Sequence, residues 1–145
     1  TGEPYMKLAS MALVLGFSLL AADPAPVTYW DAAKVAEALA KTGLIAQNAD
    51  YMVAGAHRDK QGQVEVHEKT TDILFVVDGE ATYVTGGTMI NGKQTRPGEW
   101  LGDGIEGGTE HHLKKGDVIV VPAGTPHWFK EVKLCNSFMV RVNSK

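Results

Sequence analysis

The sequence lacks several features that would point to a particular class of protein. It contains a single cysteine, Cys135, so no internal disulfide can form, and the apolar neighbours of that cysteine indicate a packing thiol. Lysine and arginine (14) do not outnumber aspartate and glutamate (17), which argues against a nucleic-acid-binding surface. No phosphate-binding loop, G-x-S-x-G motif or paired-cysteine motif is present. The sequence therefore gives no sign of nucleotide binding, serine hydrolysis or disulfide chemistry.

Long hydrophobic runs are also scarce. Residues 8–20 form an apolar stretch of 13 residues, which is too short to cross a membrane comfortably. Met6-Lys7 precedes this stretch and Ala21-Ala22 follows it, as in a secretory signal peptide. We therefore interpret residues 6–22 as a signal peptide and residues 1–5 as upstream or cloning-derived. The alternative is an ordinary amphipathic N-terminal helix. On the first interpretation the mature protein is secreted or periplasmic, with no membrane attachment after signal removal.

The remaining chain, residues 23–145, has the length and composition of one globular domain. Thr28 or Asp31 can cap a short helix that runs through Lys41 and ends at Gly43. From residue 51 onward the pattern predicts short strands at 51–57, 64–67, 72–77, 81–85, 88–90, 111–113, 118–121, 128–132 and 138–142. Asp78-Gly79 is typical of a hairpin turn, and the Gly-rich segment 96–109 is predicted to be a loop. We expect an all-β barrel or jelly roll with a short N-terminal helix outside it.

Two short motifs carry the residues that could bind a metal. The first motif contains Glu65, His67 and Asp72, and the second ends in His127. Glu65 and His67 are two residues apart, so on a strand their side chains point to the same face. Two imidazoles and two carboxylates are a suitable ligand set for one divalent metal ion. They would also balance the charge of a dication in a buried site.

These motifs resemble the two-motif signature of the cupin superfamily. The second cupin pattern, G-x5-P-x-G-x2-H-x3-N, is matched at Gly116, Pro122, Gly124 and His127, while Glu131 replaces the closing Asn. The resemblance extends over about residues 50–141 and implies a double-stranded β-helix (jelly-roll) barrel with a metal in its mouth.

The first cupin pattern, G-x5-H-x-H-x3,4-E-x6-G, is matched with substitutions. His67 and Gly79 keep the spacing of the second His and the last Gly, Glu65 replaces the first His, and Asp72 replaces the Glu. The leading Gly is displaced to Gly62. The resemblance thus implies Glu65, His67, Asp72 and His127 as ligands of one divalent metal ion. Mn, Fe, Zn, Ni or Co would suit mixed N/O ligands, and the carboxylates favour Mn or Fe.

Three further residues are expected near the metal. Phe129 and Glu131 have the same strand parity as His127, so Phe129 would give the pocket an apolar wall. Glu131 would be a catalytic base, or else a surface charge at the end of a strand. Tyr83 would shape the pocket, although core packing is the commoner use of such a residue.

These observations leave the function open. The first hypothesis is a metal-dependent enzyme that acts on a small organic substrate as a dioxygenase, isomerase or lyase. The second is a non-catalytic cupin that binds a small molecule or a metal, and the third is a metal-free interaction domain. The fold does not decide between them. Related barrels commonly dimerise through edge strands, so a homodimer is also expected.

Overall fold

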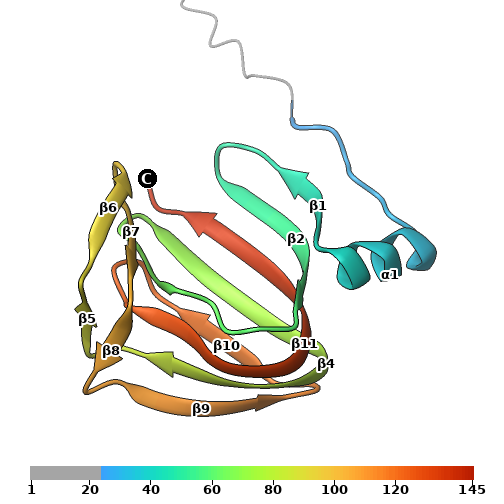
Figure 1. The fold of residues 1–145 in the computed structure, drawn as a ribbon. Helices are drawn as coiled ribbons and strands as arrows, with labels where there is room; N and C mark the ends of the chain where they lie inside the picture. The colour runs from blue at the N-terminus through green and yellow to red at the C-terminus, as the bar shows by residue number, and fades with distance from the viewer. Residues whose placement is uncertain (1–23) are drawn as a thin grey trace, which may run out of the picture.

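The computed structural model describes residues 24–145, which form a β-barrel with one helix packed against its outside (Figure 1). The proposed signal peptide, residues 6–22, and residues 1–5 lie outside the described part of the chain. Among the described residues, no helix is long and apolar enough to cross a membrane. The prediction of an all-β jelly-roll barrel with a short N-terminal helix is confirmed.

The helix α1 (Ala32–Lys41) begins where the sequence predicts. The side chain of Asp31 accepts a hydrogen bond from the backbone N–H of Lys34 at 2.9 Å, which caps the helix. The strands are β1 (Gly43–Gln47), β2 (Tyr51–Arg58), β3 (Val64–His67), β4 (Thr70–Thr85), β5 (Thr88–Ile90), β6 (Lys93–Arg96), β7 (Glu99–Gly102), β8 (Gly104–Glu106), β9 (Thr109–Lys114), β10 (Val118–Val121) and β11 (His127–Asn143).

Two long strands, β4 and β11, hold the barrel together. They pair antiparallel over their whole length, from Thr70 opposite Asn143 to Thr85 opposite His127. β10 pairs with the first half of β4 and β9 with its second half, while β2 pairs with the second half of β11. β3 joins at the first residue of β11 and continues the sheet to β7 and β6. Within residues 24–145, only β5 and β8 form a separate two-stranded sheet.

The length of these two strands corrects the sequence analysis. Asp78-Gly79 is not a hairpin turn, because β4 continues through it and bends there with Gly79 at φ +82°. Segments 128–132 and 138–142 are likewise parts of the single strand β11. The prediction of a loop over 96–109 is also wrong, since the segment contains β7 and β8. β7 lacks a clear strand pattern, and its structure comes from backbone pairing with β3.

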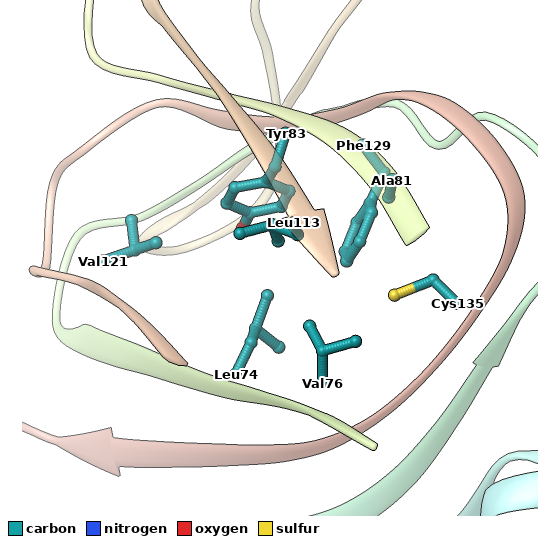
Figure 2. Close-up of a cluster of buried hydrophobic side chains, with 8 residues drawn as sticks. All are labelled: Leu74, Val76, Ala81, Tyr83, Leu113, Val121, Phe129 and Cys135. Atoms are coloured by element: carbon teal, nitrogen blue, oxygen red, sulfur yellow. The ribbon is translucent and has the colours of Figure 1, made fainter. Parts of the chain in front are cut away.

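The hydrophobic core lies inside the barrel and is formed by side chains of β4, β9, β10 and β11 (Figure 2). Its buried members are Leu74, Val76, Ala81, Tyr83, Leu113, Val121, Phe129 and Cys135. Cys135 is only 1% exposed, and burial raises the pKa of its thiol, so it is a packing residue as predicted. Tyr83 meets Phe129 edge to face, with ring centroids 4.6 Å apart. Tyr83 and Phe129 therefore belong both to the core and to the wall of the site described below.

Gly79 is expected to tolerate no side chain. A Cβ there would overlap the carbonyl oxygen of Leu134, on a backbone whose φ is also left-handed. Gly79→Ala should therefore destabilise the protein by about 3 kcal/mol or more, by combining backbone strain with a steric clash. Gly116→Ala is the matched control, because φ is +91° there but a Cβ would meet nothing within 4 Å. Urea denaturation measures the free energy of unfolding of both variants. An equal loss of stability in the two would show that the clash with Leu134 adds nothing to the backbone strain.

The outer edge of the barrel at β10 is apolar. Among the described residues β10 pairs only with β4, and its side chains Val118 and Val120 are 58% and 55% exposed. Exposed apolar side chains on an edge strand are typical of a protein–protein contact. The homodimer stays a prediction, which light scattering can test.

Candidate metal centre

The four predicted ligands come together inside the barrel from three strands. β3 supplies Glu65 and His67, β4 supplies Asp72, and β11 supplies His127, whose backbone pairs directly opposite Glu65. The Nε2 atom of His67 lies 3.3 Å from Glu65 Oε2 and 3.5 Å from Asp72 Oδ2. The Nε2 atom of His127 lies 3.6 Å from the same Asp72 oxygen and 3.9 Å from Glu65 Oε2. Four potential ligand atoms thus face one small space.

Both imidazoles are held so that Nε2 points into this space. His67 Nδ1 donates to Glu99 Oε2 at 2.6 Å, and His127 Nδ1 donates to the backbone carbonyl of Thr125 at 3.0 Å. Metal-binding histidines in proteins are usually oriented in this way by a partner on the other ring nitrogen. The Nε2 atom of His127 is buried and has no hydrogen-bond partner. A metal ion would satisfy it.

The charges in the site depend on one another. Burial would raise the pKa of Glu65, but the hydrogen bond with His67 and the nearby His127 and Arg141 lower it to about 2, so Glu65 is ionised. Burial lowers the pKa of His127, which keeps this imidazole neutral at pH 7. Burial opposes a charge on His67 too, but hydrogen bonds to Asp72 and Glu65 raise its pKa to about 10. In the metal-free protein, a proton on His67 therefore balances part of the carboxylate charge.

The ligand atoms of Glu65, His67 and His127 lie within 4.8 Å of one another, a spacing that a single ion could bridge. Asp72 reaches both imidazoles through Oδ2, while its Oδ1 is buried without a hydrogen-bond partner. The shorter Asp side chain therefore reaches the site, although the cupin pattern has Glu at this position. The donor set fits a divalent metal ion. Coordination by each of the four residues stays a prediction.

Two residues of the site were missed in the sequence. Glu99 lies in the segment predicted to be a loop, and it reaches His67 because β7 pairs with β3 at these two positions. Arg141 lies on β11 opposite Asp72, and its Nη2 atom approaches His67 Nε2 at 3.1 Å. Neither residue belongs to a recognisable motif, and only the strand register brings them to the site.

A small cavity adjoins the ligand atoms. Tyr83 and Phe129 line it, as do Trp128 and Met139, and the space left open is about 20 Å³. That is room for roughly one water-sized occupant. Burial raises the pKa of Tyr83 above its ordinary value, so its hydroxyl stays protonated. The cavity thus has one apolar wall, and its polar lining consists of three candidate ligands together with Arg58, Gln63 and Arg141.

Glu131 is not brought to this cavity, so its assignment as a base beside the metal is corrected. A β-bulge falls between Phe129 and Glu131, where the register with β4 shifts by one residue. The bulge reverses the parity that the sequence analysis assumed. Glu131 is exposed and lines a separate surface groove with Thr82 and His112.

Comparisons with known proteins agree with the fold described above. Residues 21–142 match the family model described as Cupin. A hydroquinone 1,2-dioxygenase solved with Cd²⁺ and 4-hydroxybenzonitrile superposes with a TM-score of 0.57 and 15% identity, over 83% of this chain and 81% of that one. The hydroquinone 1,2-dioxygenase of Sphingomonas sp. TTNP3, with 4-hydroxybenzoate bound, gives 0.56 and 13%, over 77% and 73%.

An uncharacterised double-stranded β-helix protein from Klebsiella pneumoniae gives a TM-score of 0.50 and 20% identity, over 70% of each chain. At these identities the structural likeness shows the fold alone. No curated protein matches the sequence significantly.

Proposed function

This chain belongs to the cupin family, and from that premise we propose that it is a divalent-metal-dependent enzyme that acts on a small organic substrate. The observation that carries the proposal is the convergence of His67 Nε2, His127 Nε2 and Glu65 Oε2, with Asp72 beside them, at a cavity with an apolar wall. Polar groups gathered beside an apolar wall are typical of a catalytic or ligand-binding site.

His67, His127 and Glu65 would hold the metal, with Asp72 as a fourth ligand or as a hydrogen-bond partner of a ligand. When bound, the metal would polarise a carbonyl or enolate oxygen or activate water or dioxygen. Glu99 and the carbonyl of Thr125 keep the two imidazoles in the orientation that coordination needs. Phe129, beside Tyr83, excludes bulk water from one side of the site.

Dioxygen chemistry is the first reaction to test. Two structural neighbours are hydroquinone 1,2-dioxygenases, and one of them was solved with Cd²⁺. The carboxylate-containing ligand set also favours Mn or Fe over softer metals. Isomerase and lyase reactions on small carbonyl acids remain part of the proposal, because the same kind of metal site supports them.

The alternative is a non-catalytic cupin that binds a metal or a small molecule. Two observations favour it: the open space of about 20 Å³ is too small for an organic substrate, and the one proposed base, Glu131, lies outside the cavity. In that case the site would bind its ligand without turnover.

The experiment loads the protein with Mn, Fe, Co, Ni or Zn and counts the bound metal. It then screens phenolic and carbonyl acids for oxygen uptake and for new products by mass spectrometry. The enzyme proposal expects turnover that needs the metal and disappears in His127→Ala. Metal binding together with ligand binding, but without product from any substrate class, would favour the binding module.

Metal affinity is expected to rise with pH. The pKa of His67 in the metal-free protein is about 10, so a metal must displace its proton at neutral pH. The apparent affinity should therefore increase by about tenfold per pH unit between pH 7 and 9, and level off above pH 10. His127 and Glu65, whose pKa values are lowered, add no dependence in this range.

The measurement is competition against a chelator, corrected for the protonation of the chelator itself. An affinity that stays constant between pH 7 and 9 would contradict coordination by His67. Glu99→Gln provides a second comparison, because it leaves Nε2 of His67 in place but weakens the partner on Nδ1. We expect this variant to bind metal about 10–100-fold more weakly.

A further inference from the structure

Arg141 lies at the centre of the candidate site, although no motif includes it. Its Nη2 atom is 3.1 Å from Nε2 of His67 and 3.3 Å from Oε2 of Glu65. Its Nε atom is 3.3 Å from Oδ1 of Asp72. A single guanidinium therefore contacts three of the four residues that would bind the metal.

The atoms that Nη2 contacts are the atoms a metal would need. The guanidinium lies in the space beside Nε2 of His67, so a metal ion cannot approach that nitrogen while Arg141 stays in place. The same guanidinium occupies Glu65 Oε2, the nearest carboxylate oxygen to that nitrogen. A positive guanidinium would also repel a dication at this distance. The two cations thus compete for one place.

Arg141 does not satisfy every polar atom at this position. Its Nε atom and Oδ1 of Asp72 are both buried, and although they lie 3.3 Å apart neither has a hydrogen-bond partner. The adjoining cavity has room for only about one water-sized occupant, so the guanidinium cannot simply shift within it. The side chain of Arg141 is 24% exposed, which leaves a path toward solvent.

We propose that Arg141 is an internal counter-ion that holds the carboxylates of Glu65 and Asp72 together in the metal-free protein and is displaced when a metal ion binds. The inference rests on the proposed function, because it requires metal binding at these residues. A residue so close to the candidate ligands would ordinarily be expected to support metal binding. Arg141 opposes it. The exchange also places a cation nearer the mouth of the site once the metal is bound.

Arg141→Met tests the proposal, because methionine keeps much of the side-chain volume and removes the charge. Arg58→Met is the matched control: Arg58 lines the same cavity, but its guanidinium packs 4.4 Å from the Phe129 ring centroid and makes no ion pair within residues 24–145. The affinity for Zn²⁺ and Mn²⁺ is measured by chelator competition. We expect Arg141→Met to bind each ion about tenfold more tightly or more, since a hydrogen bond to a charged group is worth at least that much. Arg58→Met removes a charge from the same cavity but no ion pair with a candidate ligand, so it should change the affinity much less than Arg141→Met does.

A second measurement uses the parent protein and so does not depend on the folding of a variant. An arginine-selective dicarbonyl reagent is applied with and without saturating Zn²⁺, and modified peptides are quantified by mass spectrometry. We expect Zn²⁺ to speed modification at Arg141 several-fold and to leave Arg58 unchanged. Slower or unchanged modification of Arg141 would overturn the exchange.

The outcomes separate this inference from the proposed function. If the parent binds metal and Arg141→Met binds it equally or more weakly, the exchange is wrong and the metal site stands. If neither protein binds any of the ions tested, the metal site itself is wrong and the exchange falls with it. Tighter binding in Arg141→Met, with faster modification of Arg141 in the presence of Zn²⁺, supports both.

Discussion

Replacing His67 and His127 together by alanine is expected to lower the affinity for a divalent metal on the order of a thousandfold or more. Loss of a single outer partner of a metal ligand already weakens binding roughly 10–100-fold, and this variant removes two candidate ligands. Both side chains are buried at 5% exposure, and both direct Nε2 into the same space. The metal content of the purified protein, measured by elemental mass spectrometry, gives the result directly.

The control for this variant replaces two histidines outside the site. His57 bonds to Asn136 through Nδ1, and His112 is exposed on β9. A His57→Ala, His112→Ala double variant should keep the metal content of the parent. Equal metal content in the two double variants would show that the imidazoles of the barrel interior are not ligands.

Glu65→Gln is expected to weaken metal binding by about 10–100-fold while keeping the size of the side chain, because a neutral amide is a poorer ligand than a carboxylate and leaves net positive charge in the site. The pKa of Glu65 is about 2, so the parent presents a full negative charge at every pH where the metal binds. Glu65→His should restore affinity and shift the preference toward Ni, Cu or Zn.

Asp72→Asn separates the roles of the two carboxylates. Asp72 contacts both imidazoles but also pairs with Arg141, so it could act as a ligand or as a partner of ligands. We expect Asp72→Asn to weaken the metal less than Glu65→Gln does, as measured by calorimetry at one pH. If Glu65→Gln binds as tightly as the parent, Glu65 is a bystander. The binding-module alternative would then become the better one.

Much of the candidate site was predictable because the candidate ligands belong to two local motifs. Glu65 and His67 are two residues apart on one strand, and His127 ends a turn of fixed spacing, so their positions follow from short stretches of sequence. The fold class was predictable for the same reason: the turns and apolar strand segments repeat at short, regular intervals.

The rest depended on pairing between distant strands. Arg141 meets Asp72 only because β11 and β4 pair in one particular register, and Glu99 meets His67 through the β3–β7 pairing. Glu131 was misplaced because a single bulged residue reverses the parity of a strand, and nothing local in the sequence signals that bulge. Register over long separations is the part that local patterns do not encode.

The same limit explains the error at Asp78-Gly79. This dipeptide favours a tight turn, and a turn and a bend make similar local demands on the backbone. The outcome is decided by pairing with the distant strand β11, in which Asp78 lies opposite Asn136 and Gly79 lies opposite Cys135. The sequence therefore predicted a change of chain direction at the right residues, but it predicted a turn where the strand only bends.

Anomalous X-ray diffraction from crystals of the metal-loaded protein, measured at the absorption edge of the metal, tests the proposed metal centre most directly. We predict one strong peak within bonding distance of Nε2 of His67, Nε2 of His127 and a carboxylate oxygen of Glu65. The guanidinium of Arg141 should be turned away from this peak. Crystals grown in excess metal that show no peak among these three side chains, or a peak only elsewhere on the protein, would contradict the assignment.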